Sequence, residues 1–296
     1  MKKVIYILLA FIAASFMNSC QEDPLSEKSV ITVDQIQQND FDKWLMANFV
    51  NPYNIDFVYR FSMNESDMNY YTIPPKYELA VKMAHLVKYL CVDAYDEVAG
   101  IDFTRAYFPK MFFLIGEWEY RNNGTIILGT AEGGKKILLS GINYLDEYIG
   151  NADELNHWYI KTIHHEFTHI LNQTRPYPSE FKQVNGNGYV ADNWSKEPYN
   201  SEYLQNGFFT AYSQENDAED FAELMSEYVT HTAEYWNATV ARAGDGAVFI
   251  NRKLDIVRAY MEDTWGIDMD VLRACILRRQ NDVITGKIDV NDISVN

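Results

Sequence analysis

The sequence has 296 residues, of which 47% are hydrophobic and 15% aromatic, so it can bury a large core and is not expected to be disordered. Its formal net charge of −17, from 42 acidic and 25 basic residues, would repel the phosphate backbone of a nucleic acid. Nucleic acid is therefore not an expected partner.

The N-terminus has the layout of a secretory signal. Two lysines precede an apolar run at 4–17, which is too short and wrongly flanked to span a membrane, and Cys20 stands where cleavage is expected. A cysteine there resembles a bacterial lipoprotein signal, although the three residues before it lack the usual Leu and Ala. An ordinary signal peptide cleaved nearby is the alternative. We expect a signal peptide at 1–19, a lipidated Cys20 as membrane anchor, and a flexible tether at 20–38.

The remainder, 39–296, is expected to be one α+β domain. Its N-terminal part, about 39–172, contains a strand at 55–61, a helix at about 75–100, and a β-rich stretch at about 108–145 that includes the hairpin signal "RNNG". These elements predict a small mixed sheet with an edge strand. The part at about 173–296 begins with an irregular stretch and then reads as mostly helical.

The helix that follows the β-rich stretch carries the most informative motif. It is expected to run from Asp153, a plausible N-cap, to Asn172, and it contains the H-E-x-x-H sequence formed by His165, Glu166 and His169. Residues four apart lie on one helix face, so the two imidazoles can bind one metal ion. Zn²⁺ suits such ligands and keeps an open coordination position, and Glu166 is placed to act as general base on an activated water. Two surface histidines beside an incidental glutamate are the alternative.

A third zinc ligand must come from elsewhere in the chain. The metzincin extension fails, because Asn172 and Arg175 replace its Gly and His. The stretch "ENDAEDFAELMSEY" resembles the second helix of gluzincins, whose first glutamate binds the metal while an acid four residues later orients a ligand histidine. Glu219 and Glu223 have this spacing, so Glu219 is the predicted ligand and Glu223 its predicted partner for an imidazole. Glu223 and then His231 are the alternative ligands, and a solvated acidic helix face is the structural alternative.

A developing oxyanion needs a hydrogen-bond donor. Tyr212, in "GFFTAYS" just before the glutamate helix, is the first candidate, followed by Tyr228 and His231. His164 is expected to be a neighbour and not a ligand, because it points about 100° away from His165 on a helix of 3.6 residues per turn.

Two further groups of residues have weaker expectations. Cys91 and Cys275 lie in apolar runs and are expected to be buried free thiols, with a single disulfide as the alternative. Aromatic residues of the irregular stretch at 174–200 are candidates for contact with substrate; they are Tyr177, Phe181, Tyr189 and Trp194.

The motifs "HHEFTHILNQ", "GFFTAYSQEN" and "EDFAELMSEY", behind a lipoprotein signal, resemble a known family of zinc-binding metallopeptidase lipoproteins, also called substrate-import-associated zinc metallohydrolase lipoproteins. The resemblance is specific over about 153–235. It implies a gluzincin-like zincin fold, one Zn²⁺ ion, outer-membrane anchoring with the domain on either the periplasmic or the cell-surface side, and association with import systems for glycans or peptides, such as a TonB-dependent complex. It does not supply a substrate.

Three functions fit these features. The first is a zinc-dependent peptidase acting on peptides or proteins. The second is a ligand-binding lipoprotein that keeps the zincin scaffold without hydrolysis, although a pure binder has no reason to retain Glu166. The third is a zinc hydrolase of a non-peptide amide or ester, which Glu166 does not distinguish from a peptidase.

Overall fold

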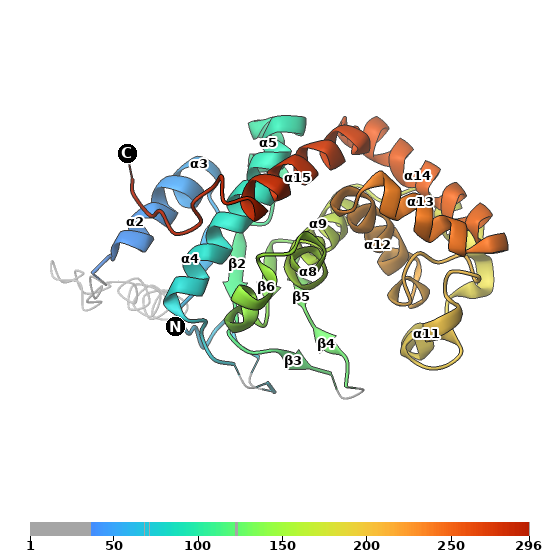
Figure 1. The fold of residues 1–296 in the computed structure, drawn as a ribbon, viewed down its shortest axis with the longest axis horizontal. Helices are drawn as coiled ribbons and strands as arrows, with labels where there is room; N and C mark the ends of the chain where they lie inside the picture. The colour runs from blue at the N-terminus through green and yellow to red at the C-terminus, as the bar shows by residue number, and fades with distance from the viewer. Residues whose placement is uncertain (1–36, 68, 71, 122–123, 296) are drawn as a thin grey trace, which may run out of the picture. The chain divides into compact units, whose positions relative to one another are not determined.

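A computed structural model of the chain describes residues 37–67, 69–70, 72–121 and 124–295 (Figure 1). The predicted signal peptide, Cys20 and nearly all of the predicted tether lie outside these residues. Residues 38–296 form a single compact unit. Within the described part of the chain, no helix is both long enough and apolar enough to span a membrane.

A small mixed sheet forms the centre of the N-terminal part. Its order is β1-β2-β6-β5, in which β1 pairs with β2 and β2 with β6 in parallel, while β5 runs antiparallel to β6. Their bounds are Asp56–Val58, Met111–Leu114, Lys136–Leu139 and Gly129–Glu132, for β1, β2, β6 and β5 respectively. The predicted hairpin forms a separate antiparallel pair, β3 (Glu119–Tyr120) with β4 (Ile126–Ile127). The edge strand β5 faces the helix that carries the H-E-x-x-H motif, which is called the site helix below.

Helices from the N-terminal part of the chain cover the sheet. They are α2 (Asp40–Leu45), η2 (Met46–Val50), α3 (Asn51–Tyr53), α4 (Tyr77–Leu86), η3 (Val87–Val92), α5 (Asp93–Ala99) and α6 (Ile101–Tyr107). α4, η3 and α5 form the continuous helix predicted for 75–100, which ends at Gly100 with φ 87°, a conformation that glycine adopts without strain. Their apolar faces, including Met83, Leu90 and Tyr95, are fully buried.

The site helix is longer than predicted and starts earlier. After η4 (Ile142–Tyr144) and α7 (Leu145–Tyr148), the helix runs without a break through α8 (Ala152–Leu155), η5 (Asn156–Ile160) and α9 (Lys161–Thr174). The prediction of Asp153 as the N-cap was wrong. The side chain of Asn151 accepts hydrogen bonds from the backbone N–H groups of Asp153 and Glu154, so Asp153 lies in the first turn, where its negative charge favours the helix dipole.

The stretch predicted to be irregular contains short helices. These are α10 (Glu180–Asn185), η6 (Gly186–Gly188), η7 (Ala191–Ser195) and the start of α11 (Tyr199–Glu202), and η8 (Tyr212–Gln214) follows after the stretch. The stretch is held against the next long helix because Tyr177 and Tyr189 donate hydrogen bonds to Asp217 and Asp220, and Phe181 packs on Phe221.

The C-terminal part is helical, as predicted. It comprises α12 (Asp217–Thr230), α13 (Ala233–Arg242), η9 (Gly244–Gly246), α14 (Ala247–Trp265) and α15 (Met269–Ile284). α12 packs along α9 and is covered by α14 and α15 (Figure 1). The fully buried pair Lys253–Asp220, at 2.6 Å, joins α14 to α12. The predicted α+β fold class is confirmed.

Candidate metal centre

Two imidazoles on α9 face a common point. His165 and His169 lie one helical turn apart, and their Nε2 atoms are 3.0 Å from each other. The first ring is almost completely buried and the second is partly exposed. α9 can present both from a buried face because the remaining buried side chains of that helix are mostly apolar or small.

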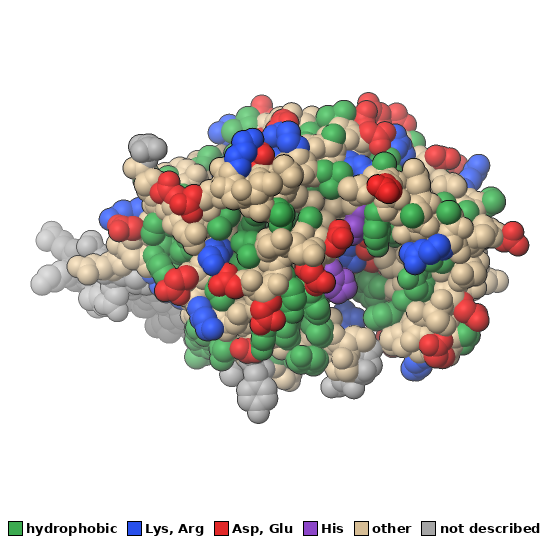
Figure 2. All heavy atoms as spheres, viewed as in Figure 1, with side chains coloured by type: hydrophobic (Ala, Val, Ile, Leu, Met, Phe, Trp, Pro, Cys, Tyr) green, Lys and Arg blue, Asp and Glu red, His purple; other side chains and the backbone are tan. Residues whose placement is uncertain are grey.

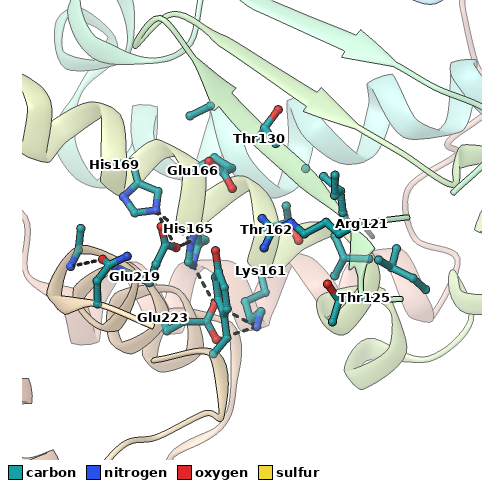
Figure 3. Close-up of a pocket in the computed structure, with 18 of the residues that line it drawn as sticks. Arg121, Thr125, Thr130, Lys161, Thr162, His165, Glu166, His169, Glu219 and Glu223 are labelled. Carbon is teal, nitrogen blue, oxygen red and sulfur yellow. Dashed lines mark hydrogen bonds and ion pairs between the residues drawn. The ribbon is translucent and has the colours of Figure 1, made fainter. Parts of the chain in front are cut away.

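α12 brings a carboxylate to the same point. Oε2 of Glu219 lies 3.0 Å from Nε2 of His165 and 3.2 Å from Nε2 of His169 (Figure 3). The place of Glu219 is fixed by the start of its helix, since the side chain of Asn216 accepts hydrogen bonds from the backbone N–H groups of Ala218 and Glu219. Glu219 therefore lies in the first turn of α12, directly opposite the histidines.

The arrangement of these three donors fits a zinc ion. Among the described residues they form a group of His, Cys, Asp or Glu whose donor atoms all lie within 4.8 Å of one another. A tetrahedral ion with ligand bonds of about 2.0–2.1 Å keeps its donors about 3.3 Å apart. The three separations of 3.0, 3.0 and 3.2 Å are close to that value. The structure thus brings together the three residues predicted as ligands.

Glu223 lies where the sequence predicted, beside a ligand imidazole. Its Oε1 atom is 2.8 Å from Nδ1 of His165, and its Oε2 atom accepts a hydrogen bond from Thr210 at 2.7 Å. A carboxylate at Nδ1 keeps the proton on that nitrogen and leaves the lone pair of Nε2 free for a metal. Burial opposes charge on His165, but its bonds with Glu219 and Glu223 raise its pKa to about 10 in the metal-free protein.

The pKa of the Glu219 carboxyl is shifted in the opposite direction, downward. Burial alone would raise its pKa, but hydrogen bonds with His165 and His169 outweigh burial and hold the pKa well below its usual range. The group is therefore ionised at neutral pH, as a metal ligand must be.

The other acids of α12 form a network that the sequence did not reveal. Nζ of Lys161, one turn before His165, lies 3.1 Å from Glu223 and 3.2 Å from Glu227. Glu227 in turn lies 3.2 Å from Nδ1 of His231. Glu227 thus contacts both Lys161 and His231. The acidic face of α12 is buried against α9, so it is not the solvated face that was the alternative expectation.

Glu166 and Tyr212, the predicted catalytic groups, both line the same pocket, which has a volume of about 610 Å³. In Figure 3, Glu166 lies between Thr130 of the edge strand and the two imidazoles. The ring of Tyr212 is 6.0 Å from that of His165, and Trp194 packs against its edge at 5.1 Å. Burial, reinforced by Glu219 and Glu215, raises the pKa of Tyr212, so its hydroxyl keeps the proton it would donate.

The pocket opens to solvent on one face of the molecule. Figure 2 shows histidine side chains at the bottom of a hollow on this face, with acidic side chains around it. The edge strand β5 lines the pocket with Gly129, Thr130 and Ala131, and Trp194, Tyr212 and Asn216 line it as well.

The alternative candidates lie elsewhere. His231 does not line the pocket; it contacts Glu227 and stacks on Tyr235 at 4.3 Å. The hydroxyl of Tyr228 donates to Asp270 at 2.5 Å and accepts from Arg258, away from the metal ligands. Neither is placed to stabilise an oxyanion. Both residues are buried near the C-terminal end of α12 and do not line the pocket.

His164 and the cysteines behave as predicted. His164 is fully buried beside the hydroxyl of Tyr95, at 3.2 Å, and burial lowers its pKa to about 3, so the ring is neutral. Cys91 and Cys275 are buried free thiols. Of the four aromatic residues suggested for substrate contact, only Trp194 lines the pocket, whereas Tyr177, Phe181 and Tyr189 hold the stretch onto α12.

Two cationic side chains in the pocket were not singled out from the sequence. They are Lys161 and Arg121, the latter from the β3–β4 hairpin. Lys161 stands four residues before His165, a helical spacing that would have placed it on the ligand face. No comparable signal marks Arg121, because its place depends on how the hairpin folds over the helix.

Comparison with known proteins identifies relatives of this site. Residues 34–270, which include His165, Glu166, His169, Tyr212 and Glu219, match a protein family described as "Putative zinc-binding metallo-peptidase". A crystal structure at 2.10 Å resolution, of a protein described in the same words from Bacteroides caccae ATCC 43185, is 38% identical. The alignment covers 90% of this chain and 100% of that one, with a TM-score of 0.75. No curated protein matches the sequence.

Proposed function

The chain belongs to this family of zinc-binding metallopeptidases, and we propose that it is a gluzincin-type peptidase in which His165, His169 and Glu219 hold one Zn²⁺ ion and Glu166 is the general base. The observation that carries the proposal is the convergence of two imidazole nitrogens and one carboxylate oxygen on a single point, in a pocket that also contains Glu166. A pocket of this size, with an edge strand as one wall, suits an extended peptide.

The protein's own groups have distinct parts in this proposal. Bound zinc supplies Lewis acidity, which polarises a carbonyl group and lowers the pKa of water. Glu166 accepts the proton of the attacking water and delivers it to the leaving amine. The hydroxyl of Tyr212 donates a hydrogen bond to the carbonyl oxygen as negative charge develops there. Glu223 holds the ring of His165 in the orientation that its ligand role requires.

The edge strand has the part of aligning the substrate. Among the strands the structure describes, β5 pairs with β6 alone, so its other edge faces the pocket. Backbone N–H and C=O groups along the outer edge of a sheet can pair with an extended chain. Such pairing would hold the scissile carbonyl near the metal ligands without requiring a particular side chain.

The proposed function is tested with Glu166→Gln. The amide keeps the size of the side chain but cannot take up a proton, so zinc content should stay at one ion per chain while hydrolysis of a peptide library, followed by mass spectrometry, falls to background. Glu180→Gln, the same change on the exposed surface, is the matched control and should leave cleavage intact. Undiminished cleavage by Glu166→Gln would refute the mechanism. Cleavage of non-peptide amides or esters, and not of peptides, by the zinc-loaded wild type would show that the substrate is not a peptide.

We further propose that the protein is exported and anchored in the outer membrane through a lipid on Cys20, where it serves a nutrient-uptake complex, such as a TonB-dependent transporter. The support is the N-terminal sequence pattern and the family resemblance. Labelling with radioactive palmitate in cells should mark the wild type and leave Cys20→Ser unlabelled. Equal labelling of both proteins would exclude Cys20 as the anchor.

A further inference from the structure

The pocket of this acidic protein carries an arginine close to the proposed metal. Arg121 extends from the β3–β4 hairpin, whose turn is closed by a hydrogen bond of 2.8 Å from its own N–H to the carbonyl of Thr125. Its guanidinium group donates to the hydroxyl of Tyr212. In Figure 3, Arg121 and Thr125 lie on the opposite side of His165 from Glu219. Arg121 is solvent-exposed and has five N–H donors, so donors remain for a ligand.

The two cations of the pocket are not equivalent. Lys161 is engaged by two buried carboxylates, Glu223 and Glu227, and has little capacity for another anion. The acids that face Arg121 are Glu215 and Glu219. Glu219 is a proposed metal ligand, so bound zinc would offset its charge, and Glu215 alone cannot occupy the five N–H donors of Arg121. Arg121 is therefore the cation available to substrate.

The direction of β5 relative to α9 indicates how an extended substrate can run through the pocket. A Cβ atom on Gly129, at the start of β5, would lie 2.7 Å from Cγ2 of Thr162, and one on Gly134, just after β5, would lie 2.8 Å from Oε1 of Gln173. The strand therefore runs beside the helix in the same direction, from the Thr162 end to the Gln173 end. Arg121 and Thr125 lie toward the first end, with Lys161.

An extended substrate would pair with β5 in the antiparallel sense, which is the more stable arrangement per residue. Its chain would then run from the Gln173 end, past His169 and His165, to the Thr162 end. The residue that follows the scissile bond, which leaves with the new amine, would lie beside Arg121. One extended residue spans about 3.5 Å, so a carboxylate on that residue stays within the pocket that Arg121 lines.

Resting on the proposed peptidase function, we propose that Arg121 binds a carboxylate of the residue immediately after the scissile bond. That carboxylate is either the C-terminal α-carboxylate, which would make the protein a carboxypeptidase, or the side chain of Asp or Glu in a longer peptide. The planar guanidinium suits a carboxylate of either origin.

The experiment measures binding in the absence of turnover. Zinc-loaded Glu166→Gln protein is titrated with three fluorescent probes: dansyl-Gly-Ala-Phe with a free carboxylate, the same peptide as its C-terminal amide, and dansyl-Gly-Ala-Asp amide. We expect one or both carboxylate probes to bind about ten- to a hundred-fold more tightly than the Phe amide, the range for a hydrogen bond to a charged group. A preference for the free acid alone identifies a carboxypeptidase, and a preference for the Asp amide alone identifies cleavage before acidic residues.

Two variants in the same background separate Arg121 from other causes. Arg121→Gln should abolish the preference, whereas Lys135→Gln, which removes a charge from the exposed turn between β5 and β6 outside the pocket, should leave it unchanged. Equal binding of all three probes, or a preference that survives Arg121→Gln because the metal itself holds the carboxylate, would overturn the proposal. Peptide cleavage by the wild type without any carboxylate preference would refute the carboxylate site at Arg121 but support the peptidase function. A carboxylate preference without cleavage would support the site but refute the peptidase function.

Discussion

Replacing Lys161 with Met should destabilise the protein strongly. Its Nζ atom lies between Glu223 and Glu227, one helical turn apart on α12, and the exposed fractions of the three side chains are 15%, 4% and 9%. Burial would lower the pKa of this lysine, but the attraction of the two carboxylates outweighs burial and raises it. Methionine would remove the cation that these two buried carboxylates share. Removing one partner of a buried ion pair costs about 3–5 kcal/mol.

Thermal and urea unfolding of the metal-free protein measure this cost. For a domain of this size, each kcal/mol corresponds to about 2–4 °C, so Tm should fall by about 6–20 °C. Lys182→Met is the matched control, because its partner Asp217 is at 3.0 Å but Lys182 itself is 64% exposed, and exposed pairs contribute about 1 kcal/mol or less. Adding Glu227→Gln to Lys161→Met should recover part of the loss. A Lys161→Met protein with the stability of the wild type would refute the reasoning that the network is charged and buried.

Three other changes test separate parts of the structure. Tyr212→Phe should lower kcat by about 10²–10³-fold, with zinc content unchanged, since an oxyanion donor acts mainly in the transition state; an unaltered kcat would exclude that role. Asn216→Ala removes the cap that places Glu219, so it should cost about 1 kcal/mol in urea unfolding and weaken zinc binding in equilibrium dialysis. Burial, opposed by Asp292 and Asp289, lowers the pKa of His85. As the pH falls, His85 is therefore protonated in the unfolded chain before it is protonated in the folded protein. This difference lowers the free energy of unfolding below about pH 6.5. His85→Gln should flatten this part of the pH dependence of unfolding, and a slope equal to that of the wild type would contradict it.

The parts of the site that depend on local spacing could be predicted from the sequence. His165 and His169 share a helix face because they are four residues apart, and Glu219 and Glu223 do so for the same reason. The short-range relation between Asn216 and Glu219 likewise follows from helix capping. The structure packs α9 against α12 and brings His165, His169 and Glu219 together.

The parts that depend on packing between distant segments could not be predicted. Arg121 reaches the pocket only because the β3–β4 hairpin lies beside α9, and Lys161 is recognisable as an ion-pair partner only once α12 is in place. With 21 tyrosines in the chain, composition does not distinguish Tyr212, in the pocket, from Tyr228, which is bound to Asp270. Tyr177, Phe181 and Tyr189 were wrongly suggested for substrate contact, because they pack on α12, a helix distant in the sequence.

The metal centre is tested most directly by anomalous diffraction at the zinc edge from crystals of the zinc-loaded protein. The geometry predicts a single strong peak within about 2.0–2.2 Å of Nε2 of His165, Nε2 of His169 and a carboxylate oxygen of Glu219. A peak coordinated by other side chains, or no peak at these three residues in crystals that contain stoichiometric zinc, would contradict it.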